Sequence, residues 1–168
     1  IYECTQIPFE LIYVDGNSPP ALRQWLEASS LERGFTLLQS SEYLSPNHAR
    51  NWALPLIKTP YVAFLDNDLI VTPGWLESLL RCAEETGAWA TGPLYLEGEP
   101  RERIIHMAGG VYEFSGNAPR RTFTTEHLLQ KERLDDLVTP LVRGPCDFVE
   151  FHCVLCPIET FQKLGPLD

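Results

Sequence analysis

The chain has 168 residues, 44% hydrophobic and 21% charged, which is typical of one globular domain with a proper core. Thirteen basic residues against 23 acidic ones give a formal net charge of -10, which argues against nucleic acid or an anionic membrane surface as the main partner. No apolar run approaches the roughly 18 residues of a membrane span, and no secretory signal pattern opens the sequence.

The first 96 residues alternate strand-like and helix-like segments. Hydrophobic periodicity and turn signals predict strands at 9–14, 35–38, 61–65 and 88–96, and helices at 21–33, 46–57 and 72–85. Ser45 before Pro46 is typical of a helix start, and the run YVAFL at 61–65 is typical of a parallel strand covered on both faces. This order predicts an α/β fold, Rossmann-like, with an open, mainly parallel sheet and helices on both faces.

The rhythm changes after residue 97. The sequence predicts a loop at 98–103, a strand at 104–114 interrupted by Gly109 and Gly110, a loop at 115–125, a helix at 126–137, a strand at 146–156 and a short helix from 157. We expect one partial domain spanning 1–168, with a nucleotide-binding half at 1–96 and an acceptor half at 97–168, rather than two independent domains.

The five cysteines are an odd number, and their spacing does not suggest a secreted disulfide framework. Reduced thiols in a cytoplasmic protein are the better interpretation. Cys153 and Cys156 form a C-x-x-C motif that could suggest zinc. Residues three apart on a strand point to opposite faces, so the apolar run around them favours two packed thiols instead.

Acidic residues follow two of the predicted strands. Asp15 follows the first, and Asp66 and Asp68 follow the apolar strand 61–65. Ligands of open α/β sheets bind beyond the carboxyl ends of the strands, and paired carboxylates offer hard oxygens to Mg²⁺ or Mn²⁺. The alternative is a pair of turn-forming or helix-capping carboxylates. The apolar strand before the motif, the proline-started helix behind it and the second acid loop favour the metal site.

Four segments together resemble family 2 glycosyltransferases, which have the GT-A fold. FELIYVDGNS at 9–18 is similar to the family's FELIIVDDGS, and NHARNWA at 47–53 to its N-x-x-R-N-x-A helix. YVAFLDNDLIVTPGWL at 61–76 resembles YIAFLDDDVxxxPxWL. CDFV at 146–149 and LGPLD at 164–168 resemble the later VDFV and GxFD elements. The ordered set covers nearly the whole chain.

The resemblance implies roles for residues that would meet the donor phosphates and a divalent metal, Mn²⁺ or Mg²⁺. Asp68 would be the direct metal ligand, and Asp66 would face the ribose or a metal-bound water. Arg50 would pair with phosphate, the alternative being a salt bridge on the helix surface. Asn51 would lie beside the donor, or would only tie the backbone of helix and strand together.

Further implied roles concern the nucleotide and the acceptor. Asp15 and Asn17 would contact the nucleotide, although Gly16 stands where many members carry a second aspartate. Asp147 and His152 are candidates for the acceptor side. The alternative for His152 is a core histidine hydrogen-bonded to a neighbour. Glu150-Phe151 replaces a small glycine of the family and would reshape the acceptor pocket.

The implied reaction transfers a sugar from a nucleoside diphosphate sugar to a hydroxyl of a glycan, a lipid-linked acceptor or a small molecule, with inversion at the anomeric carbon. The family's first strand is expected before Ile1 and its catalytic base after Asp168, so we name no base and expect this stretch alone to be inactive. Membrane association of a longer parent protein stays open.

Three alternatives remain. A phosphatase of the aspartate-nucleophile class also uses D-x-D, but on its first strand and with glycine next, where this chain has Leu69. A catalytically silent module could bind a sugar nucleotide or a protein with the same fold. A purely structural domain would bury or misdirect Asp66 and Asp68.

Overall fold

The computed structural model describes residues 1–116 and 122–168. The chain folds into two compact units. The first comprises residues 1–62, 71–77 and 156–168, and the second comprises residues 63–70 and 78–155. The two units are therefore interleaved along the sequence, and the functional halves 1–96 and 97–168 stay a prediction.

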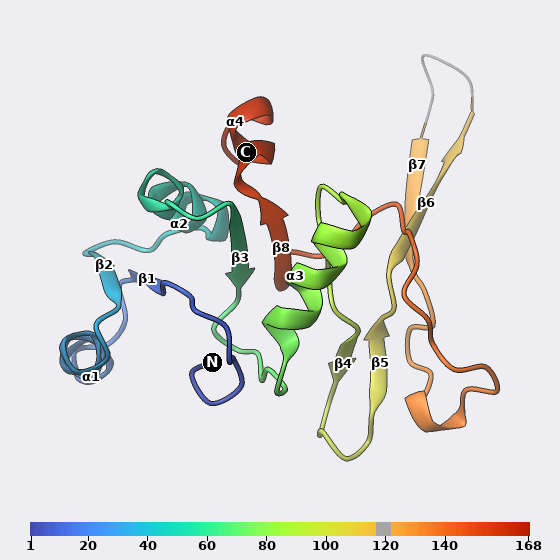
Figure 1. Cartoon of the computed structure of the whole chain (residues 1–168), viewed down its shortest axis with the longest axis horizontal. Coiled ribbons are helices and arrows are strands. Elements are labelled where there is room, and N and C mark those ends of the chain that lie inside the picture. The colour runs from blue at the N-terminus through green and yellow to red at the C-terminus, as the bar shows by residue number, and fades with distance from the viewer. Residues whose placement is uncertain (117–121) are drawn as a thin grey trace. The chain divides into compact units, whose positions relative to one another are not determined.

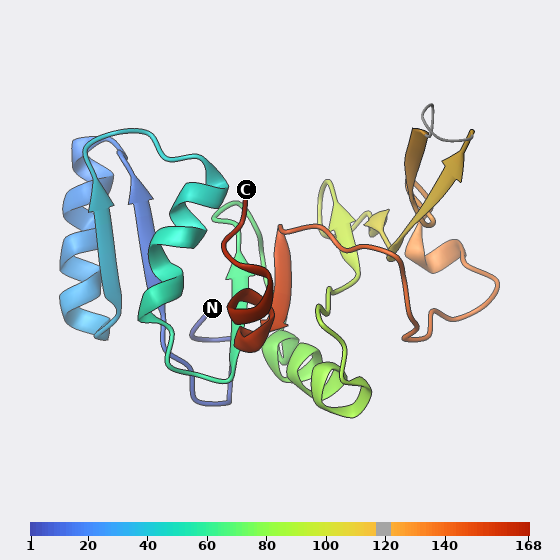
Figure 2. The same cartoon turned by 90° about the horizontal axis from the view of Figure 1, so that it is seen from above.

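The first unit is built around a parallel strand pair with a helix on each side. Its elements are β1 (Ile12–Gly16), α1 (Pro20–Arg33), β2 (Thr36–Ser40), α2 (Pro46–Ala53) and η1 (Leu54–Leu56). β1 and β2 are parallel, with Ile12 opposite Thr36. Figure 1 and Figure 2 show α1 and α2 on opposite sides of this pair. For these elements the predicted alternation of strands and helices is confirmed.

Local signals define both helices of this unit. α1 ends at Gly34, whose left-handed backbone (φ 74°) a residue without a Cβ adopts without strain. At the start of α2 the hydroxyl of Ser45 accepts a hydrogen bond from the His48 backbone N–H, and Pro46 occupies the first turn, where its missing N–H costs no hydrogen bond. The predicted helix start at Ser45 and Pro46 is confirmed.

Three elements have residues in both units: β3 (Tyr61–Leu65), α3 (Trp75–Thr86) and β8 (Cys153–Pro157). The short helix α4 (Ile158–Leu164) follows β8 and belongs to the first unit. β3 pairs with β8. The flanking backbone hydrogen bonds, Asp66 N–H to His152 O and Ile158 N–H to Pro60 O, make the pair antiparallel.

The two cysteines of β8 are buried and free. Burial raises the pKa of the Cys156 thiol to about 11. Burial, with a smaller effect of the Asp66 charge, raises the pKa of the Cys153 thiol to about 12. Both thiols therefore stay protonated near neutral pH, and their burial in β8 agrees with the prediction of packed thiols.

The second unit contains two further antiparallel pairs. Its elements are β4 (Tyr95–Glu97), β5 (Ile104–Met107), β6 (Gly110–Ser115), β7 (Thr122–His127) and η2 (Leu134–Asp136). β4 pairs with β5, and β6 pairs with β7 along their whole length (Figure 1). The interruption that Gly109 and Gly110 predict falls between β5 and β6 and is confirmed. Part of the predicted loop 115–125 lies outside the described residues, and its end belongs to β7.

The helix predicted at 126–137 is wrong. Leu129 and Lys131 have positive φ angles of 57° and 69°, which an α-helix does not contain. The segment instead runs beside β5, where Lys131 N–H donates to Ile105 O and Ile105 N–H donates to Glu132 O, both at 2.8 Å. Backbone pairing with β5 therefore overrode the helical periodicity of the sequence.

The predicted single sheet with mainly parallel strands is also wrong in its extent. Among residues 1–116 and 122–168, the strands form four two-stranded sheets, of which only β1–β2 is parallel. The strand predicted at 88–96 is reduced to β4 and an isolated bridge at Thr91, and that at 146–156 to β8 and an isolated bridge at Phe148. In both segments the apolar run extends beyond the residues whose backbones pair.

No helix in the described part of the chain combines the length and the apolar character needed to cross a bilayer.

Candidate functional site

The acids that follow β3 lie in the second unit and remain accessible. The side chain of Asp66 is 31% exposed, and Asp68 is exposed. Asp66 Oδ2 lies 3.0 Å from His152 Nδ1. The side chain of His152 is 47% exposed, so this histidine is not the core residue of the alternative interpretation. The predicted metal-site acid and a predicted acceptor-side residue therefore meet.

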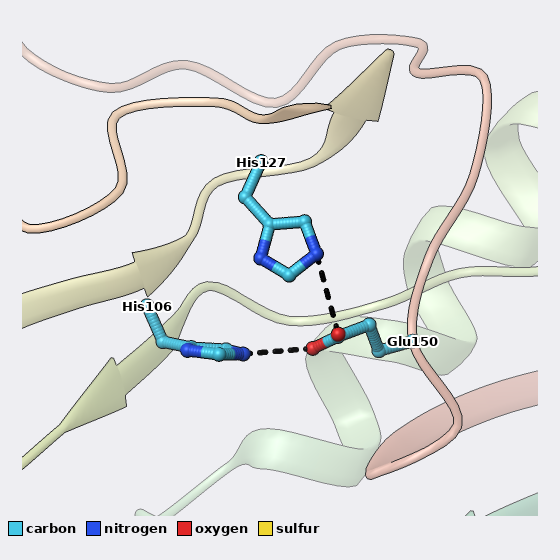
Figure 3. A group of neighbouring side chains, drawn as sticks. All are labelled: His106, His127 and Glu150. Carbon is cyan, nitrogen blue, oxygen red and sulfur yellow. Dashed lines mark hydrogen bonds and ion pairs between the residues drawn. The ribbon is translucent and has the colours of Figure 1, made fainter. Parts of the chain in front are cut away.

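Glu150 joins three histidines. Its Oε2 atom lies 2.9 Å from His106 Nε2 and 3.6 Å from His152 Nε2, and its Oε1 atom lies 3.3 Å from His127 Nε2. Figure 3 shows the rings of His106 and His127 both directed at this carboxylate. The side chains of His106, His127 and Glu150 are 26%, 21% and 24% exposed. The three side chains are thus mostly buried but keep part of their surface in contact with solvent.

Strand alternation positions His106. It occupies β5 between Ile105 and Met107, both fully buried, and successive side chains of a strand point to opposite faces. The two apolar neighbours fix β5 in the core of the second unit and so direct the imidazole to the other face. The Tyr95 hydroxyl donates to the Glu150 backbone carbonyl at 2.8 Å and fixes the segment that carries the carboxylate.

His127 owes its place to the pairing of β6 and β7. It is the last residue of β7 and lies opposite Gly110. A Cβ at Gly110 would overlap the ring of Phe148, so glycine lets this ring pack against the strand. The Phe148 ring in turn lies beside that of His127, with 5.8 Å between centroids.

The far side of His106 carries a second carboxylate. His106 Nδ1 lies 3.2 Å from Glu97 Oε2, and Lys131 pairs with the other oxygen of Glu97. The hydrogen bond from Lys131 is the largest cause that lowers the pKa of Glu97, and a smaller one from His106 adds to it. Glu97 therefore stays ionised and can accept a hydrogen bond from His106 Nδ1–H.

Asp15 belongs to the first unit, lies at the end of β1 and is only 2% exposed. It accepts a hydrogen bond from Ser18 N–H at 2.9 Å, and its Oδ2 lies 3.6 Å from Arg23 Nε. Burial alone would raise the pKa of this carboxyl, but hydrogen bonds from Ser18 and Gln39 and the charge of Arg23 outweigh it and lower the pKa. The side chain is thus already satisfied within its own unit.

The other predicted donor contacts also lie in the first unit. Asn17 is exposed with a left-handed backbone (φ 75°), which asparagine tolerates. Arg50 Nη1 donates to Asn47 Oδ1 at 3.0 Å. The Asn51 amide donates to Leu167 O at 2.6 Å and accepts from Leu167 N–H at 2.9 Å. Asn51 therefore ties α2 to the last residues of the chain, and its contact with a donor stays a prediction.

Asp147 does not lie on a strand as expected. It is exposed and accepts a hydrogen bond from Tyr112 N–H at 3.2 Å, while its own N–H donates to Gly110 O at 2.8 Å. It thus fastens the start of β6, and its proposed role toward an acceptor stays a prediction.

The sequence did not single out His106, His127 or Glu97 as functional residues, and it named Glu150 only as part of a bulky pair that would reshape the acceptor pocket. The pattern Ile104-Ile105-His106-Met107 contains one usable signal, because strand alternation separates the histidine from its two apolar neighbours. Nothing in the linear pattern shows that two histidines and a glutamate from distant segments converge.

The sequence model described as "Glycosyl transferase family 2" matches residues 3–139, which is most of the chain. The chain belongs to glycosyl transferase family 2. The match includes Asp66 and Asp68 and ends before Glu150 and His152. Membership supports glycosyltransferase activity in general and implies the GT-A fold, with a nucleotide-sugar donor and an acceptor. A search of curated proteins gave no significant match.

Proposed function

We propose that this family 2 chain belongs to an inverting glycosyltransferase that transfers a sugar from a nucleoside diphosphate sugar to an acceptor hydroxyl. The observation that carries the proposal is the family match across Asp66 and Asp68, two accessible carboxylates directly after β3. Accessible acids at a strand end suit ligand binding, whereas a structural pair would be buried against partners.

The donor set of this motif fits a hard divalent cation. Asp66 and Asp68 offer only carboxylate oxygens, which Mg²⁺ and Mn²⁺ prefer, and both are accessible from solvent. In the proposal these two residues hold the ion, which when bound neutralises charge on the diphosphate leaving group. His152 Nδ1, 3.0 Å from Asp66, would orient that carboxylate.

The remaining assignments follow the family resemblance. Arg50 would bind phosphate, and Asp15, Asn17 and Asn51 would contact the donor. Asp15 would do so mainly by shaping the loop after β1, since its carboxylate is occupied by Ser18 and Arg23. Asp147 and His152 are proposed for the acceptor side. No residue of this chain is assigned as the general base.

Titration calorimetry of the chain with UDP and with GDP, each with and without Mn²⁺, tests the proposal. We expect Mn²⁺-dependent binding that Asp68→Asn weakens at least about 10-fold, because a direct ligand is lost. Asp136→Asn, which changes an exposed acid of η2, is the matched control. Unchanged affinity in Asp68→Asn would refute the metal assignment. Binding without sugar transfer by the longest available form of the protein would favour the silent binding module.

A further inference from the structure

We propose that His106, His127 and Glu150 form a second metal site, for a borderline transition metal of the Zn²⁺ type. This inference does not rest on the proposed transferase function. The three residues come from β5, from the end of β7 and from the segment before β8, all within the second unit. Each offers one ligand atom, and these atoms all lie within 4.8 Å of one another.

The donor set selects the class of metal. Two imidazole nitrogens and one carboxylate oxygen suit Zn²⁺, or Co²⁺ as its spectroscopic substitute, and do not suit Mg²⁺ or Ca²⁺, which take oxygen ligands. About a quarter of the surface of these side chains stays exposed, and this exposure leaves room for water or another ligand at a fourth position. Two histidines and a glutamate with an open position match the composition of catalytic rather than structural zinc sites.

The distances already approach those of a metal complex. His106 Nε2 lies 2.9 Å from Glu150 Oε2, and His127 Nε2 lies 3.3 Å from Glu150 Oε1. A tetrahedral Zn²⁺ with bonds of about 2.0–2.1 Å places its ligand atoms roughly 3.4 Å apart. Side-chain rotation that brings the three ligand atoms from within 4.8 Å of one another to this spacing would admit the ion.

The hydrogen bonds of His106 independently favour a cation at this cluster. Its two ring nitrogens each face a carboxylate, Glu97 at 3.2 Å and Glu150 at 2.9 Å. A neutral imidazole has one N–H, so it satisfies only one of these contacts, and the other requires a second proton or a cation. Glu97, which Lys131 also contacts, can accept a hydrogen bond from His106 Nδ1–H, and the Nε2 lone pair is then left to bind a metal. In zinc sites a ligating histidine usually donates its other ring N–H to a carboxylate, as His106 would to Glu97.

His127 can adopt the same state. Its Nε2 faces Glu150, and its Nδ1 lies 3.3 Å from the amide nitrogen of Gln130. If that amide is turned by 180°, its Oε1 atom would accept a hydrogen bond from His127 Nδ1–H while Nε2 binds the ion. The rings of His106 and His127 are already fixed edge to face, with 5.2 Å between centroids.

The new site shares no ligand with the family's acid pair. His152 lies between them, 3.0 Å from Asp66 and 3.6 Å from Glu150. Two ions of different class would therefore be held by separate sets of residues within one unit. Loss of Asp68 should leave the Zn²⁺-type site intact, and loss of His127 should leave Mn²⁺-dependent nucleotide binding intact.

The test titrates the chelator-stripped full chain with Co²⁺ and follows its visible d–d absorption, then displaces Co²⁺ with Zn²⁺ to obtain the affinity. We expect one ion per chain, and at least about 10-fold weaker binding for His127→Asn and for Glu150→Gln. Glu97→Gln, which removes the carboxylate behind His106 but no metal ligand, should weaken metal binding about 10-fold or more. His48→Asn and Cys146→Ser, which remove an exposed histidine and an exposed thiol, and Asp68→Asn are expected to bind as the wild type does.

Circular dichroism and urea midpoints in the absence of metal establish that each variant folds. The proposal is overturned if folded His127→Asn and Glu150→Gln chains both keep wild-type affinity, or if no Co²⁺ absorption develops. In either case the cluster is only a hydrogen-bonded network. It is equally overturned if Asp68→Asn, rather than the cluster variants, abolishes Zn²⁺ binding.

Discussion

Each unit of the molecule carries an acid at the end of a strand, and the two acids have opposite surroundings. In the first unit Asp15 is buried and bound by Ser18 and Arg23. In the second unit Asp66 is about one-third exposed, and its side chain contacts the exposed His152. The same residue type at the same kind of position therefore serves structure in one unit and remains accessible to ligands in the other.

The difference follows from what surrounds each strand end. Asp15 is still part of β1, between two helices, so its charge is removed from water and must be compensated by hydrogen bonds and a cation. Asp66 comes after the last residue of β3, and its compensation is supplied partly by solvent. The burial of a carboxylate, rather than the motif that contains it, therefore decides how much it contributes to the stability of the fold.

Removal of each acid in turn tests most directly whether the two units differ in this way. Asp15→Ala leaves Ser18 N–H and Arg23 without their buried acceptor, and we expect a loss of about 3 kcal/mol in the free energy of unfolding. Asp68→Ala, at an exposed position, should change it by less than about 0.5 kcal/mol. Urea unfolding followed by circular dichroism measures both. Equal effects of the two changes would contradict the contrast between the units.

The second unit has its own structural requirement, at Gly110. In Gly110→Ala the new methyl group overlaps the Phe148 ring, and we expect a cost of about 2 kcal/mol together with weaker metal binding, because Phe148 packs beside His127. Gly144→Ala is the matched control, since a Cβ there meets nothing within 4 Å. Thermal unfolding and Co²⁺ titration of both variants test this. A Gly110→Ala chain as stable as Gly144→Ala would show that the Phe148 contact is unimportant.

The smallest expected effect is a pH dependence that belongs to the first unit. The pKa of Asp15 is lower in the folded chain than its ordinary 3.8, so its ionised form stabilises the fold above that value, and this contribution is lost as the pH falls through the folded pKa. The difference in free energy of unfolding between wild type and Asp15→Asn should be constant from about pH 5 to 7 and shrink below about pH 3.8. Urea midpoints across this range measure it. A difference that grows on acidification would contradict the lowered pKa of Asp15.

Several elements could be read directly from local sequence. Ser45-Pro46 sets the start of α2, Gly34 ends α1, and the apolar run 61–65 coincides with β3. In each case the signal lies within a few residues, as a cap, a left-handed glycine or a continuous apolar run. The accessible pair Asp66 and Asp68 could be placed for the same reason, since it follows directly from the end of that strand.

The sequence by itself therefore determined the family, the α/β alternation of the first unit and the acid motif after β3. Only the tertiary structure decided that Asp15 is buried, that residues 128–133 pair with β5 instead of forming a helix, and that His106 and His127 meet at Glu150. Caps and turns depend on neighbours along the chain. Burial, sheet pairing and a shared carboxylate depend on segments that lie far apart in the sequence and meet only on folding. No local sequence pattern shows which of these segments will meet.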